Sequence, residues 1–203
     1  MQEQISALPF TMPPIRRGNR CCDAVWEGML TIIMECRDNE AELAQTLSAL
    51  VSGAVEGIVR DVIVLDHGSR DGSSKVADAA GCRFLTEWDI TEVLRSARGD
   101  WLLLLEPGAR PMTGWVDAIV DHVAIDPNPA RFSGARSYRR PFLQRLGRKT
   151  PPLERAYLVS KRQAMAAARA GMALSDFARG GNARDLGAEI VPAWAVKAMR
   201  TGV

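Results

Sequence analysis

The chain has 203 residues, of which 47% are hydrophobic and 25% charged, and its formal net charge is +2 at pH 7. These values are ordinary for one soluble α/β domain with a well-buried core. No apolar run approaches the about eighteen residues that a transmembrane helix needs. The weak net charge and the lack of a recognisable nucleic-acid-binding module argue against a nucleic-acid partner.

The first part of the chain differs from the rest. Residues 1–28 contain prolines and the basic run 16–20, and they lack the apolar core of a signal peptide. Met29 stands directly before the first apolar run, so we expect residues 1–28 to be a disordered extension and residues 29–203 to form a single domain. The four cysteines show no metal-ligand spacing, which predicts reduced thiols and a cytoplasmic protein.

Apolar runs and helical patterns alternate along the chain. Leu30–Met34 predicts a buried strand, and the helix after it carries Leu43, Leu47 and Leu50 on one face, with Asn39 as its N-cap. Further strands are expected near 62–65, 82–85, 101–105, 156–160 and 189–191, and further helices near 74–80, 113–123 and 162–170. The β-α-β-α-β order predicts a mostly parallel central sheet with helices packed on it.

The second of these strands ends in a carboxylate and a polar turn. Residues 62–65 are followed by Asp66 and then by Gly, Ser and Asp residues up to Ser73. Open α/β sheets bind ligands at the carboxyl ends of their strands, so Asp66 and Asp71 predict a nucleotide site there. The structural alternative is an Asx-turn at Asp66 or an N-cap at Asp71, with no ligand. The strand at 101–105 also ends in a carboxylate, that of Glu106.

With these motifs in this order, residues 30–123 resemble the family 2 glycosyltransferases, whose nucleotide-sugar-binding fold is called GT-A. Residues 66–73 correspond to the family's Asp-Asp-Gly-Ser-x-Asp-Gly-Thr/Ser motif, and residues 97–100 to its Ala-x-Gly-Asp. The resemblance implies a GT-A-like three-layer α/β sandwich and a hexosyltransferase-like, inverting enzyme that uses a nucleotide-diphosphate sugar. It implies that the nucleotide is bound by Asp38, Asp66, His67, Gly68, Ser69 and Asp71.

Three departures from the family pattern bear on function. Glu35 stands in place of the usual proline, and His67 in place of the second aspartate of the strand-2 pair. The segment 106–108, Glu-Pro-Gly, replaces the Asp-x-Asp that holds a divalent cation between the donor's phosphates. Glu106 can still offer one carboxylate to Mg²⁺ or Mn²⁺, but Gly108 has no side chain to offer. We therefore expect at most a metal site with a single carboxylate ligand from this segment.

The catalytic base also departs from the family. Inverting members place an acidic pair after the acceptor-binding region, where it takes the proton of the attacking hydroxyl. That pair is missing here, and Asp176 and Asp185 are the remaining candidates. For each of them the structural alternative is a solvated helix carboxylate or an N-cap. The missing acidic pair and the replaced Asp-x-Asp leave a second hypothesis. On this hypothesis the chain is a catalytically degenerate protein that binds a nucleotide sugar or has a regulatory role.

One segment is strongly basic. Between Asp126 and Glu154 there is no acidic residue, and the stretch Arg131–Lys149 contains seven arginines and lysines interleaved with apolar side chains. The functional interpretation is an anionic partner: an anionic lipid-linked acceptor, the inner face of the membrane, or the donor's diphosphate. The structural alternative is a solvated basic loop.

Overall fold

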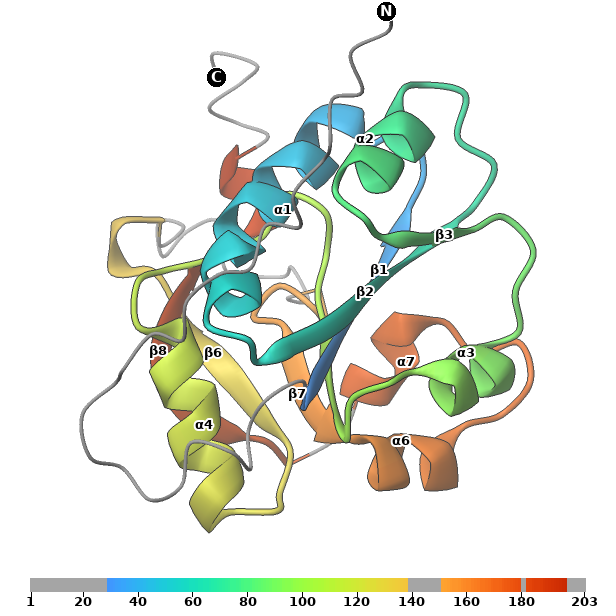
Figure 1. Cartoon of the computed structure of the whole chain (residues 1–203). Helices are drawn as coiled ribbons and strands as arrows, with labels where there is room; N and C mark the ends of the chain where they lie inside the picture. The colour runs from blue at the N-terminus through green and yellow to red at the C-terminus, as the bar shows by residue number, and fades with distance from the viewer. Residues whose placement is uncertain (1–28, 139–150, 180–181, 197–203) are drawn as a thin grey trace, which may run out of the picture.

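The computed structural model describes residues 29–138, 151–179 and 182–196. The segment 1–28, expected to be a disordered extension, lies outside these residues. The described residues form an eight-stranded sheet in the order β3-β2-β1-β4-β7-β6-β8-β5 (Figure 1). The strands are β1 (Leu30–Cys36), β2 (Val59–Asp66), β3 (Arg83–Leu85), β4 (Trp101–Leu104), β5 (Arg110–Pro111), β6 (Ala130–Gly134), β7 (Tyr157–Ser160) and β8 (Arg184–Val191).

The helices fall between the strands, as the alternating pattern predicts. They are α1 (Glu40–Val55), α2 (Ser73–Ala79), α3 (Ile90–Ser96), α4 (Trp115–Ile125), α6 (Lys161–Ala167) and α7 (Leu174–Ala178). Asn39 is the N-cap of α1, but its side chain accepts a hydrogen bond from the backbone N of Arg37 and none from the helix. Within the described part of the chain, no helix combines the length and the apolar character needed to cross a bilayer.

The sheet is mostly parallel, which confirms the predicted fold class. β1 pairs in parallel with β2 and β4, β2 with β3, and β6 with β8. β7 is antiparallel to both β4 and β6, and β5 is antiparallel to β8. The short strands β5 and β6 were not predicted from the sequence, because neither contains the continuous apolar run that marks a buried strand.

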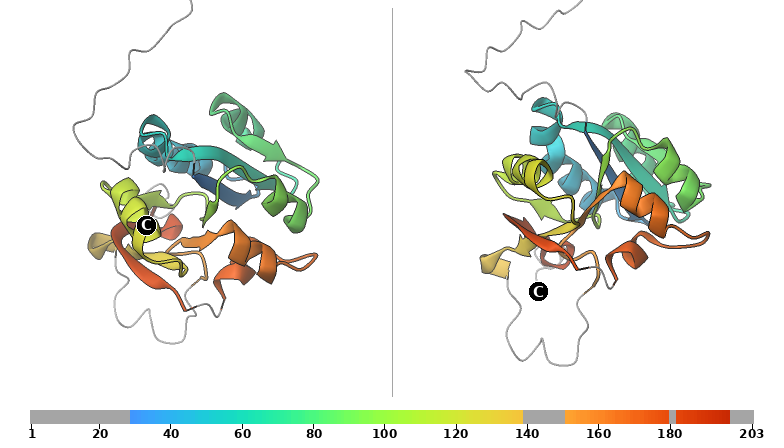
Figure 2. Two further views of the ribbon diagram at one scale, coloured as in Figure 1. Left: turned by 60° about the horizontal axis from the view of Figure 1, so that its bottom comes forward. Right: turned by 90° about the horizontal axis from the view of Figure 1, so that it is seen from below.

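Alternation of side chains along the strands divides the core into two layers. Ile32 and Met34 of β1 face the side covered by α1, α2 and α4, whereas Ile33 faces the side covered by α3, α6 and α7. Figures 1 and 2 show these two groups of helices on opposite sides of the sheet. Successive residues of a strand point to opposite faces, so each central strand contributes to both cores. The result is the expected three-layer sandwich.

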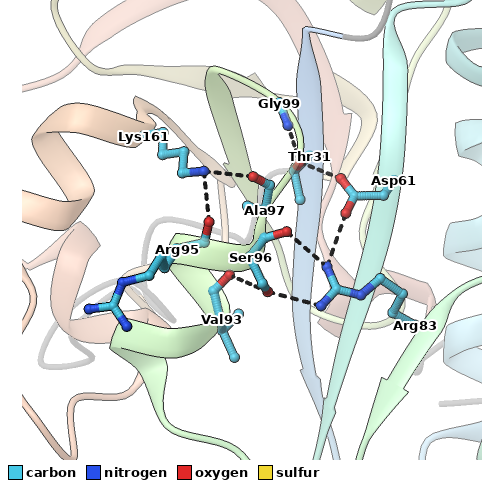
Figure 3. Close-up of polar contacts among 9 residues, drawn as sticks. All are labelled: Thr31, Asp61, Arg83, Val93, Arg95, Ser96, Ala97, Gly99 and Lys161. Atoms are coloured by element: carbon cyan, nitrogen blue, oxygen red, sulfur yellow. Dashed lines mark hydrogen bonds and ion pairs between the residues drawn. The ribbon is translucent and has the colours of Figure 1, made fainter.

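The Ala-x-Gly-Asp motif belongs to the amino edge of this sheet, where a polar network holds β4 against β1 (Figure 3). The backbone N of Gly99 donates to the hydroxyl of Thr31 at 2.8 Å, and that hydroxyl donates to Asp61. Asp61 also pairs with Arg83 at 3.3 Å, and Arg83 donates to Ser96 just before the motif. The motif is therefore explained by the architecture of the sheet.

Lys161 forms further hydrogen bonds with the segment that connects α3 to β4. Its Nζ donates to the backbone oxygens of Ala97, at 2.7 Å, and Arg95, at 2.9 Å (Figure 3). Its backbone N donates to the oxygen of Asp100 at 2.8 Å. These bonds give partners to carbonyl groups at the end of α3 and before β4, which would otherwise lack intrahelical or ladder bonds.

Candidate functional site

The carboxyl ends of β2, β1 and β4 are neighbours in the sheet, and the candidate site residues follow them. The pairing of Cys36 with Asp66 places the ends of β1 and β2 side by side. Because side chains alternate, Cys36 and Asp66 face the α1 and α2 layer, and Glu35 and His67 face the α3 and α7 layer. The carboxyl edge therefore carries the Cys36 thiol and the Asp66 carboxylate on one side, and the Glu35 carboxylate and the His67 imidazole on the other.

Asp66 is the most buried acidic side chain of this edge, with 5% of its surface exposed. Its carboxylate accepts hydrogen bonds from the backbone N of Gly68 and Ser69, from the Ser69 hydroxyl at 2.5 Å, and from the Cys36 thiol. Burial alone would raise the pKa of Asp66, but the bonds from Ser69, Cys36 and Gly68 hold it below its ordinary value. The Asx-turn is therefore formed, and a contact of Asp66 with a nucleotide stays a prediction.

The loops after β1 and β2 are joined by reciprocal hydrogen bonds. Asp38 accepts from the backbone N of Arg70 at 2.7 Å, and its own backbone N donates to the Ser69 hydroxyl at 3.0 Å. Asp71 accepts from the backbone N of Glu40 at 2.9 Å. Asp38 has a left-handed backbone with φ 50°, a conformation that aspartate tolerates better than most residues. The structure thus brings Asp38, Ser69 and Asp71 together in one hydrogen-bonded pair of loops.

Two arginines on these loops were not singled out from the sequence. Arg37 and Arg70 are both exposed, and among the described residues neither guanidinium has an ion-pair partner. The backbone of each is fixed by the loop bonds, Arg37 through Asn39 and Arg70 through Asp38. The sequence did contain a signal for them, since Arg37 precedes Asp38 and Arg70 lies between Ser69 and Asp71, all of which were predicted site residues. They give the edge two cations suited to an anionic ligand.

Glu35 and His67, two departures from the family, lie next to each other on the α7 side. His67 Nε2 is 3.4 Å from Glu35 Oε2, and its ring packs edge-on against Trp88 with 5.3 Å between centroids. Glu35 Oε1 also accepts from the backbone N of Leu174, the first residue of α7. Trp88 donates from its ring nitrogen to the backbone oxygen of Asp66 at 3.3 Å. Sequence reasoning did not foresee this cluster, because its members come from four separate segments.

The structure does not provide the family's pair of metal-binding aspartates. Gly108 has φ 97°, and a Cβ there would lie 3.3 Å from Ala193, so an aspartate at this position would be strained and crowded. Glu106 is half-buried, and burial first and the charge of Glu154 second raise its pKa. Among the described residues, no group of three or more His, Cys, Asp or Glu side chains could hold a metal ion. The residues present therefore do not fit a metal site with two aspartate ligands.

Replacing Glu106 with glutamine is expected to raise the melting temperature at pH 7. A raised pKa in the folded state means that the stability linked to Glu106 is present below its unfolded pKa and lost as the pH rises through the folded pKa. The difference between Glu106→Gln and wild type should therefore shrink towards pH 4, as measured by differential scanning calorimetry. Glu87→Gln, at an exposed glutamate, is the control and should change little. A lower melting temperature for Glu106→Gln would show that its carboxylate has a favourable partner.

The two candidate bases lie in different places. Asp176 is in the first turn of α7, where it accepts from the backbone N of Ala173 at 3.0 Å and pairs with Arg179 at 2.9 Å. Asp185 is on β8, bonded to the Ser133 hydroxyl and to Arg155, and four strands separate β8 from β2. Through Leu174, only the helix of Asp176 is tied to the carboxyl edge described above.

The basic segment falls only in part within the described residues. Residues 139–150 lie outside the described part of the chain. Arg131 is turned inward: it donates to the backbone oxygens of Pro152 and Ala178 and lies over the ring of Tyr157. Arg136 is exposed and 3.7 Å from Glu189. Arg131 therefore serves the fold, and an anionic lipid-linked acceptor or membrane surface at this segment stays a prediction.

The three-layer sandwich with its mostly parallel sheet has the GT-A type of fold, which structures of a known glycosyltransferase share. A glucosyl-3-phosphoglycerate synthase from Mycobacterium tuberculosis, in complex with phosphoglyceric acid, matches with a TM-score of 0.51 and 19% identity over 72% of this chain and 63% of that chain. The same synthase with Mn²⁺, UDP-glucose and phosphoglyceric acid matches with a TM-score of 0.50 and 21% identity over 72% and 62%. A structure described only as a mycobacterial protein matches with a TM-score of 0.57 and 20% identity over 90% and 77%.

These likenesses concern the fold. The chain spans less than two thirds of the length of the synthase, with 63% of it covered. Neither the protein-family models nor the curated proteins give a match to the sequence. The GT-A fold expected from the motifs is thus confirmed, whereas membership of family 2 rests on the motifs alone.

Proposed function

We propose that this protein is a glycosyltransferase that takes its sugar from a nucleoside-diphosphate donor, in the manner of the family 2 enzymes that its motifs resemble. The observation that carries the proposal is the interlocked pair of loops after β1 and β2, at the carboxyl edge of a GT-A fold. Asp38 and His67, both exposed, contact the base and ribose, and Arg37 and Arg70 contact the diphosphate. UDP-glucose, bound by the synthase of similar fold, supports this class of donor.

The proposed reaction is a displacement at the anomeric carbon. The acceptor hydroxyl oxygen forms the new bond to that carbon, the bond to the diphosphate oxygen breaks, and the nucleoside diphosphate leaves with both electrons. On an inverting route the hydroxyl proton passes to a carboxylate, and we assign this role to Asp176 because four strands separate β8, which carries Asp185, from β2. Arginine side chains stabilise the charge that develops on the leaving group.

The test is calorimetric titration with UDP, UDP-glucose and other nucleoside diphosphates, in EDTA and in Mn²⁺. We expect binding in both conditions, with Mn²⁺ changing the affinity little, because Gly108 offers no ligand. Affinity should fall as ionic strength rises, since exposed Arg–phosphate contacts are screened. The double variant Arg37→Gln/Arg70→Gln should bind about tenfold more weakly or worse. Lys75→Gln, at an exposed lysine of α2, is the matched control and should bind as wild type.

Two outcomes would change the assignment. If none of the nucleoside diphosphates binds, the proposed function is refuted. Binding only with Mn²⁺, together with turnover lost in Glu106→Gln, would restore an ordinary metal-dependent site. A donor-hydrolysis assay with UDP-glucose accompanies the titration, because binding without any turnover is what the catalytically degenerate alternative predicts.

A further inference from the structure

Glu35 connects two parts of the carboxyl edge that are far apart in the sequence. One carboxylate oxygen accepts from the backbone N of Leu174 at 2.7 Å, across 139 residues of sequence, and the other lies 3.4 Å from His67 Nε2. The Glu35 side chain is 25% exposed and that of His67 45% exposed, so the pair lies at the rim of the edge and outside the core. A single side chain thus contacts both the nucleotide loops and α7.

His67 is in turn fixed by its surroundings. Its ring packs edge-on against Trp88, whose ring nitrogen donates to the backbone oxygen of Asp66. The imidazole therefore has two neighbours of different kinds, an aromatic face from the segment before α3 and a carboxylate from β1. Glu35 is also hydrogen-bonded to the backbone of α7, so its loss would remove one contact of the His67 ring and one contact of the helix together.

The helix α7 depends on such contacts because it has only five residues. Helices of this length are unstable by themselves and take their position from tertiary contacts. Leu174 and Phe177 bury its apolar side, while Glu35 binds its first N–H group and Arg131 its last residue, Ala178. A negative group at the first turn and a positive group at the end both favour the helix dipole.

We propose that Glu35 is a positioning residue that holds the start of α7 and the ring of His67 in one arrangement beside the nucleotide loops. This inference rests on the proposed function. It gives a role to the carboxylate that stands where the family has proline, since proline could bind neither partner. It also sets the place of Asp176, two residues after Leu174, relative to the donor.

The experiment compares Glu35→Ala and Glu35→Gln with Ser160→Ala in the full chain. Glutamine keeps an oxygen for Leu174 and an amide for a neutral imidazole, so it should restore what alanine loses. Ser160→Ala removes the capping box of α6 at the opposite edge of the sheet, which makes it a matched control for lost helix capping. Hydrogen exchange of the peptides covering 172–178 reports on α7, and titration with UDP reports on the site.

For Glu35→Ala we expect faster exchange over 172–178 and UDP affinity lower by about tenfold. Glu35→Gln should approach wild type in both measurements, and Ser160→Ala should bind UDP as wild type does. Equal UDP affinity in Glu35→Ala and wild type would overturn the positioning role, as would an equal loss of affinity in Ser160→Ala. If wild type binds no nucleoside diphosphate, the proposed function fails and this inference fails with it, whereas unchanged exchange in Glu35→Ala refutes the inference alone.

Discussion

Gly99→Ala is expected to destabilise the protein by about 3 kcal/mol or more, because the new methyl group would strike backbone atoms. A Cβ at Gly99 would lie 2.5 Å from the oxygen of Met29 and 2.6 Å from the nitrogen of Thr31. Neither atom can move without displacing β1 from β4. Displacement of this segment from β1 would also stretch the hydrogen bond from the backbone N of residue 99 to the buried Thr31 hydroxyl. Thermal unfolding should show a melting temperature lower by about 10 °C.

Gly134→Ala is the matched control for this prediction. Gly134 ends β6, and a Cβ there would meet nothing within 4 Å, so its substitution should change stability by less than about 0.5 kcal/mol. If the two alanine variants melt at the same temperature, close packing of Gly99 on β1 is not what requires glycine in the Ala-x-Gly-Asp motif.

Asp66→Asn is expected to lower stability by about 2 kcal/mol at pH 7, because hydrogen bonds to a charged acceptor are worth more than neutral ones. Asparagine keeps one acceptor oxygen, but its NH2 group cannot accept, so either the bonds from the backbone N of Gly68 and Ser69 or those from the Ser69 hydroxyl and the Cys36 thiol lose their acceptor. The pKa of Asp66 is lowered in the folded state, so its stabilisation is present above the unfolded pKa and lost as the pH falls through the folded pKa. Urea unfolding should therefore show a gap between wild type and Asp66→Asn that narrows below about pH 4.

Asp78→Asn, at an exposed aspartate of α2, is the control and should unfold as wild type at every pH. Titration with UDP separates the two roles of Asp66. Unchanged stability with lost UDP affinity would mean that Asp66 is a ligand contact and that the Asx-turn does not depend on its charge. If Asp66→Asn is less stable but binds UDP as wild type does at temperatures below its melting range, Asp66 serves the turn alone.

The sequence determined much of the framework. Continuous apolar runs at β1, β2 and β4 identify buried parallel strands, because only a strand covered on both faces tolerates them. The order of the motifs at 66–73 and 97–100 then indicated the GT-A fold. Departures from the family pattern were visible too, since Gly108 cannot supply a ligand whatever its surroundings.

The tertiary structure decided what those residues do. Local sequence does not show that Glu35 meets the start of α7, because that contact joins residues 139 positions apart. The short strands β5 and β6 are defined by pairing, β5 with β8 and β6 with both β7 and β8, so no local pattern marks them. Likewise, Arg131 looked like a free cation of a basic segment, yet two backbone carbonyls hold it inside the fold. Composition and periodicity determine which residues are buried, whereas the partner of a polar side chain depends on chain segments that only folding brings together.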